Sequence, residues 1–243
     1  MRLPGGRPWG PAAVEYASAP RPSQRTPWNG ASWCAVDLEL SGLDPRRHEI
    51  ISFAAIPIEQ GRIQLAGAVW GLVRPTRALS EPAIRIHGIR AADLLDAPPL
   101  QTAIEPLLRA IAGRTLVAHV ARVERAFLGP ALRAGGVRLR GPIADTSVLG
   151  RLWLCERDGT VPAEMPLGEL AGALGLPAHA QHDALGDALT TAQVFIAAAS
   201  HLSVERVETV RSLARAGRRL QAALRYPTEP ASAAADGARH RRF

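Results

Sequence analysis

The sequence contains no lysine, so arginine supplies all 29 of its basic side chains. Any contact with a phosphate must therefore come from arginine or from backbone amides. The formal net charge is +7, but it is concentrated near the two ends of the chain. Residues 1–30 hold four arginines and one acid, residues 203–243 hold nine and four, and residues 31–202 hold sixteen and seventeen. The central region is thus nearly neutral, and basicity alone does not identify its partner.

Cysteine is also scarce, and long apolar runs are missing. The spacing of the two cysteines, Cys34 and Cys155, fits neither a metal clip nor a disulfide framework, so we expect both to be reduced. No run approaches the roughly 18 apolar residues of a membrane span, and the first residues lack the apolar segment of a secretion signal. We therefore expect a soluble, cytoplasmic protein without membrane contact.

Composition along the chain predicts four regions. Residues 1–30 are rich in Pro, Gly, Ser and Arg without periodicity, which predicts a disordered tail. Residues 31–202 are expected to form the folded domain. Apolar residues at helical spacing predict one C-terminal helix over 203–226, packed on the domain or offered to a partner. Residues 227–243 are expected to be a disordered basic tail.

The order of apolar patterns within the folded region indicates an α/β class. The predicted strands are 33–40, 49–58, 63–73, 115–118 and, weakly, 137–143. The predicted helices are 91–95, 100–111, 122–134, 145–155, 167–174 and 183–199, and 84–89 is expected to be a loop. An antiparallel three-strand meander followed by alternating strands and helices predicts a mixed sheet flanked by helices.

Two acids interrupt the first predicted strand. Asp37 and Glu39 are two residues apart, so their side chains project from the same face of a strand whose other residues are apolar. Such a pair repels unless a cation lies between the carboxylates, and hard divalent ions such as Mg²⁺ prefer oxygen ligands. The alternative is an exposed edge strand with solvated acids.

Two further segments carry candidate site residues. His182 and Asp187 flank the start of a predicted helix, where both side chains can face one cavity. Alternatively, Asp183 is only an N-cap and His182 a surface loop residue. Glu124 shares a helix face with Phe127 and Leu128 and so points toward the body, unless it is a solvated acid paired with arginine.

Together these segments resemble the DEDDh family of 3′→5′ exonucleases, over about residues 32 to 200. The first motif is Asp37-x-Glu39 followed by 41–45, and the third is His182-x4-Asp187. The Ile86-His87-Gly88-Ile89 loop and the Asp145-Thr146 pair also match the family pattern. Because the third motif carries His rather than Tyr, the chain resembles the His branch. The resemblance implies a ribonuclease H-like fold.

The second motif departs from the family pattern at three positions. Val120 replaces the usual Asn, Val123 replaces Phe and Glu124 replaces Asp. Glutamate keeps the charge but is one methylene longer, so it still reaches an ion or its bound water if the helix sits slightly back. We expect the change to affect rate and metal preference more than activity itself.

The resemblance implies a mechanism with two Mg²⁺ ions, for which Mn²⁺ substitutes. Asp37, Glu39, Glu124 and Asp187 would hold the ions, and His182 would be the general base. Leu40, Ser41 and Gly42 would hold the terminal nucleotide, Leu43 would wedge against a base, and His87 would line the nucleotide pocket. The expected reaction is hydrolysis of single-stranded DNA or RNA 3′ ends to nucleoside monophosphates, in DNA repair or replication.

Two other interpretations stay open. The altered second motif is also compatible with a nucleic-acid-binding module that has weakened or lost catalysis. In the other, the tails carry the function and the domain is a scaffold, although the tails lack the aromatic-interleaved basic motif that stacks on bases. A polymerase or another protein is the expected partner of the C-terminal helix. The sequence does not determine the oligomeric state or a preference for DNA or RNA.

Overall fold

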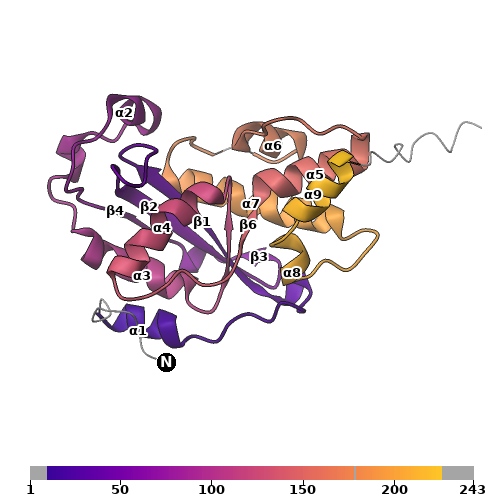
Figure 1. Ribbon diagram of the computed structural model, residues 1–243, viewed down its shortest axis with the longest axis horizontal. Coiled ribbons are helices and arrows are strands. Elements are labelled where there is room, and N and C mark those ends of the chain that lie inside the picture. Colours follow the sequence, from indigo (N-terminus) through magenta and orange to yellow (C-terminus); the bar gives the residue numbers. More distant parts are fainter. Residues whose placement is uncertain (1–9, 178, 226–243) are drawn as a thin grey trace, which may run out of the picture.

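The protein is built on one mixed sheet, shown in Figure 1, and the computed structural model describes residues 10–177 and 179–225. The strands are β1 (Ser32–Leu40), β2 (Ile50–Glu59), β3 (Arg62–Ile63), β4 (Val69–Leu72), β5 (Thr115–Ala118) and β6 (Ile143–Asp145). Their order is β3-β2-β1-β5-β6, and β4 also pairs with β2. β1 is antiparallel to β2 and parallel to β5, so the predicted mixed sheet is confirmed.

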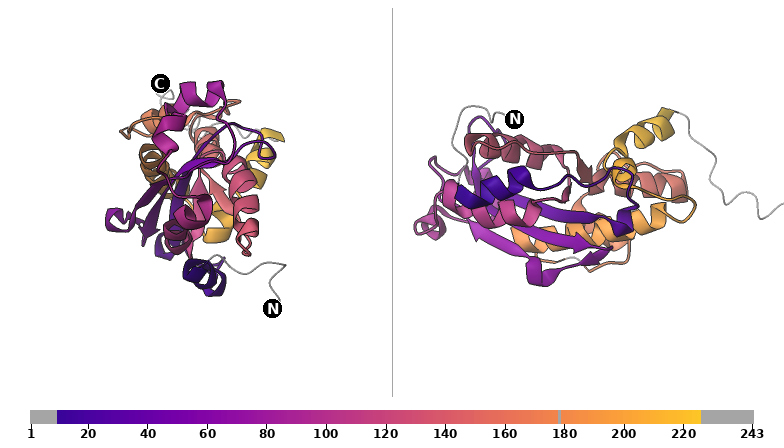
Figure 2. Two further views of the ribbon diagram at one scale, coloured as in Figure 1. Left: turned by 90° about the vertical axis from the view of Figure 1, so that its left-hand side faces the viewer. Right: turned by 90° about the horizontal axis from the view of Figure 1, so that it is seen from below.

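Helices cover both faces of this sheet (Figure 2). The α-helices are α1 (Gly10–Ser18), α2 (Glu81–His87), α3 (Leu100–Ile111), α4 (Arg122–Ala134), α5 (Thr146–Asp158), α6 (Leu167–Ala173), α7 (Ala184–Leu202), α8 (Val210–Leu213) and α9 (Gly217–Arg225). The described residues also form three short 3₁₀ helices, η1 (Trp28–Gly30), η2 (Leu65–Gly67) and η3 (Ala91–Leu94). No helix among the described residues is long and apolar enough to cross a membrane.

Alternate side chains of β1 point to opposite faces of the sheet and pack into two separate hydrophobic cores. Trp33 and Ala35 pack with α5 and α7, where the Trp33 and Phe195 rings lie 4.6 Å apart. Cys34 and Val36 point to the other face and pack with α1, α3 and α4. Because β1 is covered on both sides, polar side chains on it are held in place by its neighbours.

Several predicted elements have the expected bounds, and others are wrong. β5, α3 and α4 lie where the apolar patterns place them. The predicted loop at 84–89 is wrong, because α2 begins at the Ser80 cap and ends at Gly88 in the left-handed region. The predicted strand 63–73 is broken by η2, and the weak strand at 137–143 is replaced by β6.

The expected disorder of residues 1–30 is wrong for residues 10–30. α1 packs on α3, and its Ala12, Ala13 and Tyr16 side chains are buried. One Arg140 nitrogen donates to the carbonyls of Tyr16, Ala17 and Ala19 and so satisfies groups at the end of α1. The sequence lacked periodicity here because a short helix needs few apolar positions to pack. Residues 1–9 lie outside the described part.

The C-terminal segment forms two helices, so the single helix predicted over 203–226 is wrong. Thr209 caps α8, and the chain turns before α9, which packs on α5. Residues 24–28 and 208–211 lie side by side, because Trp28 N donates to the Glu208 carbonyl and Arg211 N to the Gln24 carbonyl. The predicted disordered tail at 227–243 lies outside the described residues.

Candidate active site

The acidic pair of β1 lies inside the sheet, so the alternative of an exposed edge strand is wrong. Asp37 pairs with Ala54 and Glu39 with Ser52 of β2, while β5 borders β1 on the other side. Pairing between β1 and β2 shifts register directly after Glu39. Such irregularities re-aim the end of a strand, here at the edge where β1 meets the loop that follows it.

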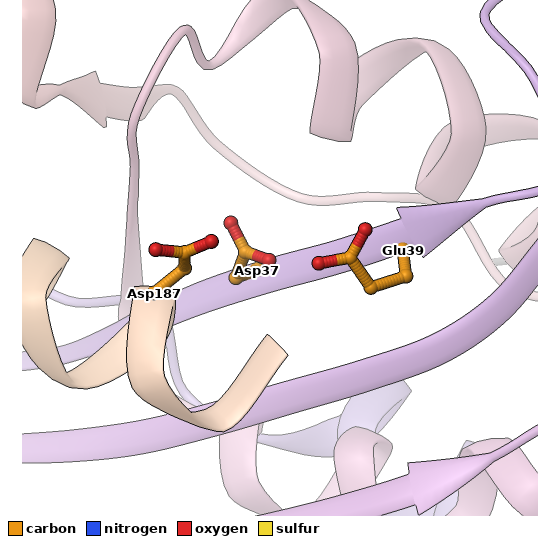
Figure 3. A group of neighbouring side chains, drawn as sticks. All are labelled: Asp37, Glu39 and Asp187. Atoms are coloured by element: carbon orange, nitrogen blue, oxygen red, sulfur yellow. The ribbon is translucent and has the colours of Figure 1, made fainter. Parts of the chain in front are cut away.

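Asp187 on the first turn of α7 completes an acidic cluster with the β1 pair (Figure 3). Asp37, Glu39 and Asp187 each offer one carboxylate oxygen, and these three atoms lie within 4.8 Å of one another. α7 approaches this closely because a Cβ at position 186 would collide with the Ala180 carbonyl, a place that only glycine fits. The Gly186-Asp187 pair therefore has a packing reason for its place in the third motif.

Burial and mutual repulsion raise the pKa values of the cluster. Desolvation, followed by the charges of Glu124, Glu39 and Asp187, raises the pKa of Asp37 well above its ordinary value. Desolvation and Asp187 raise the pKa of Glu39 to about 7. Burial also raises the pKa of Asp187, although the amide of His182 opposes that rise. A cation among these oxygens would favour the ionised forms.

Glu124 is buried beside the cluster but is not one of its three members. Its side chain is 4% exposed, so the alternative of a solvated acid paired with arginine is wrong. Its Oε2 atom is buried without a hydrogen-bond partner. Burial raises the pKa of Glu124 to about 8, and its charge is the largest single charge effect on Asp37. The structure thus places Glu124 close to Asp37, with one oxygen unpaired.

His182 is among the residues that line a cavity of 780 Å³, together with Asp37 and Asp187. Its backbone amide donates to the Asp187 carboxylate at 2.7 Å, and its backbone φ is 58°. Asp183 is an N-cap, since its carboxylate accepts from Gly186 N at 2.9 Å. The alternative therefore holds for Asp183 as an N-cap, and His182 is an exposed loop residue that is also among the residues lining the cavity.

The loop after β1 holds the other predicted contacts. Leu40 and Ser41 are buried, and the Ser41 hydroxyl accepts from Glu49 N at 2.9 Å, so Ser41 fixes the loop. Gly42 lies against the His48 ring, where a Cβ would clash, and Leu43 is 79% exposed at the tip. His87 is the last residue of α2. Burial lowers the pKa of its imidazole, and the charge of nearby His182 lowers that pKa further, whereas a hydrogen bond to the Leu40 carbonyl raises it.

Asp145 has a structural role that the sequence did not reveal. Its carboxylate accepts from the amides of Val120 and Ala121, at 3.1 and 3.0 Å, and from the amide and hydroxyl of Ser147. It therefore ties the start of α5 to the turn between β5 and α4. Val120 in that turn has φ 60°, which a β-branched residue rarely adopts. The motif gave only the Asp145-Thr146 pair, without its partners.

The donor set suits a hard divalent cation. Three carboxylates lie within 4.8 Å of one another, and a fourth, Glu124, keeps an unpaired buried oxygen beside them. Burying several acids together is costly unless they are neutralised by protons or by a metal ion. Mg²⁺ and Mn²⁺ accept such all-oxygen ligand sets and leave positions for water and phosphate.

Comparison with known proteins places this site in a family. Residues 34–195 match the family model RNase_T, described as Exonuclease. A DNA polymerase III subunit epsilon-like protein of Rhodobacter capsulatus is 31% identical over 175 residues, which cover 70% of this chain and 24% of that protein. The DNA polymerase III subunit epsilon of Aquifex aeolicus is 27% identical over 168 residues, which cover 68% of this chain and 79% of it.

A solved structure shares the fold. Exonuclease X in complex with 5′ overhanging duplex DNA superposes with a TM-score of 0.58 and 24% identity, over 75% of this chain and 99% of that one. The match to the Rhodobacter capsulatus protein spans about a quarter of its length, and the matches to two Thermotoga PolC-type polymerases span about an eighth of theirs. The matched part is therefore a minor share of the length of those proteins.

Proposed function

Because the chain belongs to the RNase_T exonuclease family, we propose that it is a 3′→5′ exonuclease that releases nucleoside monophosphates from single-stranded ends. The observation that carries the proposal is the acidic cluster of Asp37, Glu39 and Asp187 beside an open cavity. We assign residues 31–202 to the exonuclease domain, a range that contains the family match at 34–195.

The enzyme uses a divalent metal ion, and we propose two Mg²⁺ ions with Mn²⁺ as a substitute. Asp37, Glu39 and Asp187 would hold them, together with the unpaired oxygen of Glu124. When bound, the ions supply charge that activates the attacking water and stabilises the phosphate undergoing displacement. The acids would hold the ions at the edge of the sheet where β1 meets the start of α7.

The side chains around the cluster divide the remaining work. His182 is one of the residues that line the cavity, and we propose that its imidazole accepts the proton of the attacking water. Its amide bond to Asp187 at 2.7 Å fixes this loop to the cluster. We also propose that Leu43, which is exposed, contacts a base, that the backbone of Leu40 to Gly42 contacts the terminal nucleotide, and that His87 lines the nucleotide pocket.

We propose that the substrate is the single-stranded 3′ end of DNA or RNA. The relatives are named as DNA polymerase III subunits, which supports replication or repair in the cytoplasm as the setting. In that setting a polymerase or another protein would contact α8 and α9, which lie outside the family match. Activity on single-stranded DNA, mismatched duplex ends and short RNA identifies the preferred substrate.

Replacing Asp37 with Asn tests the assignment. The change removes one charge and keeps the volume, so the fold should persist while hydrolysis of a labelled single strand falls at least about a thousandfold. A 3′-labelled strand should release its label as a mononucleotide at once, and a 5′-labelled strand should shorten stepwise. Both reactions should require Mg²⁺ or Mn²⁺.

The matched control is Asp96→Asn, which removes an equal charge from an exposed position outside the cavity. It should leave the rate unchanged. A rate for Asp37→Asn within about tenfold of the parent, a barrier change of only about 1.4 kcal/mol, would contradict the assignment. Metal-independent binding of single strands without any hydrolysis would instead identify a nucleic-acid-binding module that has lost catalysis.

A further inference from the structure

Two arginine-lined cavities continue from the active-site cavity along β6, which is the last strand in the sheet order. The first, of 460 Å³, shares Arg122 and Asp145 with the active-site cavity. The second, of 390 Å³, shares Arg215 with the first and reaches Thr115 at the start of β5. Neighbouring cavities share lining residues, so the three follow one another from the acidic cluster toward Thr115 at the start of β5.

Three separate parts of the chain supply exposed arginines to this path, which we call the arginine groove. Its members are Arg21 before β1, Arg122 and Arg125 on the first turn of α4, and Arg215 and Arg218 around the start of α9. Figure 1 shows β6 between α4 and the yellow helices α8 and α9. Within residues 10–177 and 179–225, these five form no ion pair with a carboxylate.

The other charged residues that line the two cavities are already engaged. Asp145 is their single acid, and its carboxylate accepts four hydrogen bonds from backbone and Ser147. Arg114 pairs with Glu59 at 2.8 Å, and Arg140 donates to carbonyls at the end of α1. The groove thus brings like charges together without local neutralisation, which favours an anionic ligand.

The phenol of Tyr16 is also affected by the positive charge of these arginines. Its hydroxyl donates to the Arg138 carbonyl at 3.3 Å and accepts from the Arg140 amide at 3.0 Å. Burial raises the pKa of the Tyr16 phenol, while the charges of Arg140, Arg21 and Arg125 all oppose that rise. The positive potential therefore extends from the start of α4 to α1, over several side chains rather than at one point.

We propose that the arginine groove binds the sugar-phosphate backbone of the strand whose 3′ end lies at the acidic cluster. This inference rests on the proposed function. The arginines place separate positive charges along the groove, and a nucleic-acid strand carries one negative phosphate per nucleotide. Arginine also forms strong, often bidentate, hydrogen bonds to phosphate oxygens. The family match ends at residue 195 and begins at residue 34, so Arg21, Arg215 and Arg218 belong to segments outside it.

Replacing Arg125 and Arg215 together with Gln tests the groove. For a long single-stranded oligothymidylate, KM should rise at least about tenfold, and binding should become less salt-dependent by roughly 0.7 in logarithmic slope for each lost phosphate contact. For a dinucleotide, which reaches only the acidic cluster, kcat and KM should stay unchanged. Arg215→Gln alone should have about half the effect on the slope, and it leaves intact the 2.9 Å hydrogen bond that Arg125 donates to the Gly141 carbonyl.

The matched control is Arg62→Gln with Arg74→Gln, two exposed arginines that do not line the three cavities. It removes the same net charge and should leave the salt slope as in the parent. An equal loss in the control, or an equal loss for the dinucleotide, would overturn the groove as a backbone path. Competition by polyglutamate as strong as by oligothymidylate at equal charge would assign it to an acidic protein instead.

Binding in EDTA separates this inference from the proposed function, because it needs no hydrolysis. The parent protein should bind labelled oligothymidylate in EDTA more tightly than the Arg125→Gln/Arg215→Gln variant does. If that difference is found but no substrate is hydrolysed, the groove stands and the exonuclease assignment fails. If hydrolysis is found but the two proteins bind equally, the assignment stands and the groove fails.

Discussion

Val120, one of the residues that line the active-site cavity, has a strained backbone conformation. Its φ of 60° lies in the left-handed region, where the branched Cβ crowds the backbone, and its amide is held there by Asp145. Such strain costs on the order of 1–3 kcal/mol. The resembled family usually has Asn at this position, a residue that tolerates the left-handed conformation.

We expect Val120→Asn to raise the free energy of unfolding by about 1 kcal/mol, because it relieves that strain. Urea unfolding of parent and variant measures the difference. Val204→Asn, at an 80% exposed position, is the matched control and should change stability by less than about 0.5 kcal/mol. A loss of stability in Val120→Asn would show that packing of the valine side chain outweighs its backbone strain.

Glu124 is the acid for which this chain and the family pattern differ. If its unpaired oxygen contacts a bound ion or its water, Glu124→Gln should lower kcat at least about a hundredfold, because ligand displacements on the order of 1 Å have effects of that size. Glu124→Asp should not restore or exceed the parent rate, since the shorter side chain no longer reaches. Rates on a 3′-labelled strand in Mg²⁺ and Mn²⁺ measure both.

The control for these rates is Glu205→Gln, an exposed acid outside the cavity, which should keep full activity. Full activity of Glu124→Gln in both metals would mean that Glu124 is not a ligand. A higher rate for Glu124→Asp than for the parent would mean that the longer glutamate side chain holds its carboxylate in a less effective position than an aspartate would.

At the scale of elements, a buried carboxylate fastens the C-terminal helices to the domain. Glu208 is 1% exposed and accepts from Arg206 at 2.8 Å and from Arg219 at 2.5 Å. The same two arginines also contact Glu156 of α5, which is half-exposed. These four charged side chains therefore connect α9 with α5, and Glu208 is the one among them that is fully buried.

We expect Glu208→Gln to lower the free energy of unfolding by about 1–3 kcal/mol, because buried charge-assisted hydrogen bonds are lost. Glu156→Gln contacts the same arginines but is solvated, so its loss should be below about 1 kcal/mol. Thermal or urea unfolding of both variants measures the contrast. Equal losses would show that burial of Glu208 does not strengthen the cluster.

The sequence predicted those elements whose own pattern determines them. α3 and α4 carry apolar residues at helical spacing, and β5 is a short apolar run that is buried on both faces. α2, η2 and α1 were missed because a cap, a turn and one long-range contact define them. The same holds for Asp145, whose partners lie about 25 residues away in the sequence.

The acidic residues of the candidate site could be predicted from the sequence more readily than the conformations of the loops around them. The spacing of Asp37 and Glu39 fixes a common strand face, and the structure brings Asp187 to that face. Residue spacing could not indicate that Ser41 is buried in the hydrogen bonds of its loop, or that Val120 adopts a left-handed conformation. Those properties depend on where the chain must turn, which packing decides.

At the scale of the whole molecule, the clustered acids make stability depend on pH and metal. The folded-state pKa values of about 7 for Glu39 and about 8 for Glu124 exceed the ordinary value of 4.5. Between the ordinary and raised values, the folded protein retains protons that the unfolded chain has lost. The stability from these groups is therefore present at low pH and is lost as pH rises through that window.

We expect the unfolding temperature in EDTA to decrease as the pH is raised from about 5 to about 8. Mg²⁺ should raise the unfolding temperature more at the higher pH, because its carboxylate ligands are ionised there. Scanning calorimetry at both values, with and without Mg²⁺, measures this. The Glu39→Gln/Glu124→Gln variant should show a flatter pH profile and a smaller Mg²⁺ effect. A parent protein that is equally stabilised by Mg²⁺ at both values would contradict the linkage.

The pairing of residues 24–28 with 208–211 also orders events during synthesis. Trp28, whose ring lies 6.0 Å from that of Phe195, receives its backbone partner Glu208 only after roughly 180 more residues have been translated. At about 5–20 residues per second, that delay is about 10 to 40 s. For most of this time α7 has not been made, so the Trp28 indole lacks the Phe195 ring, and the nascent chain offers a chaperone a defined apolar target.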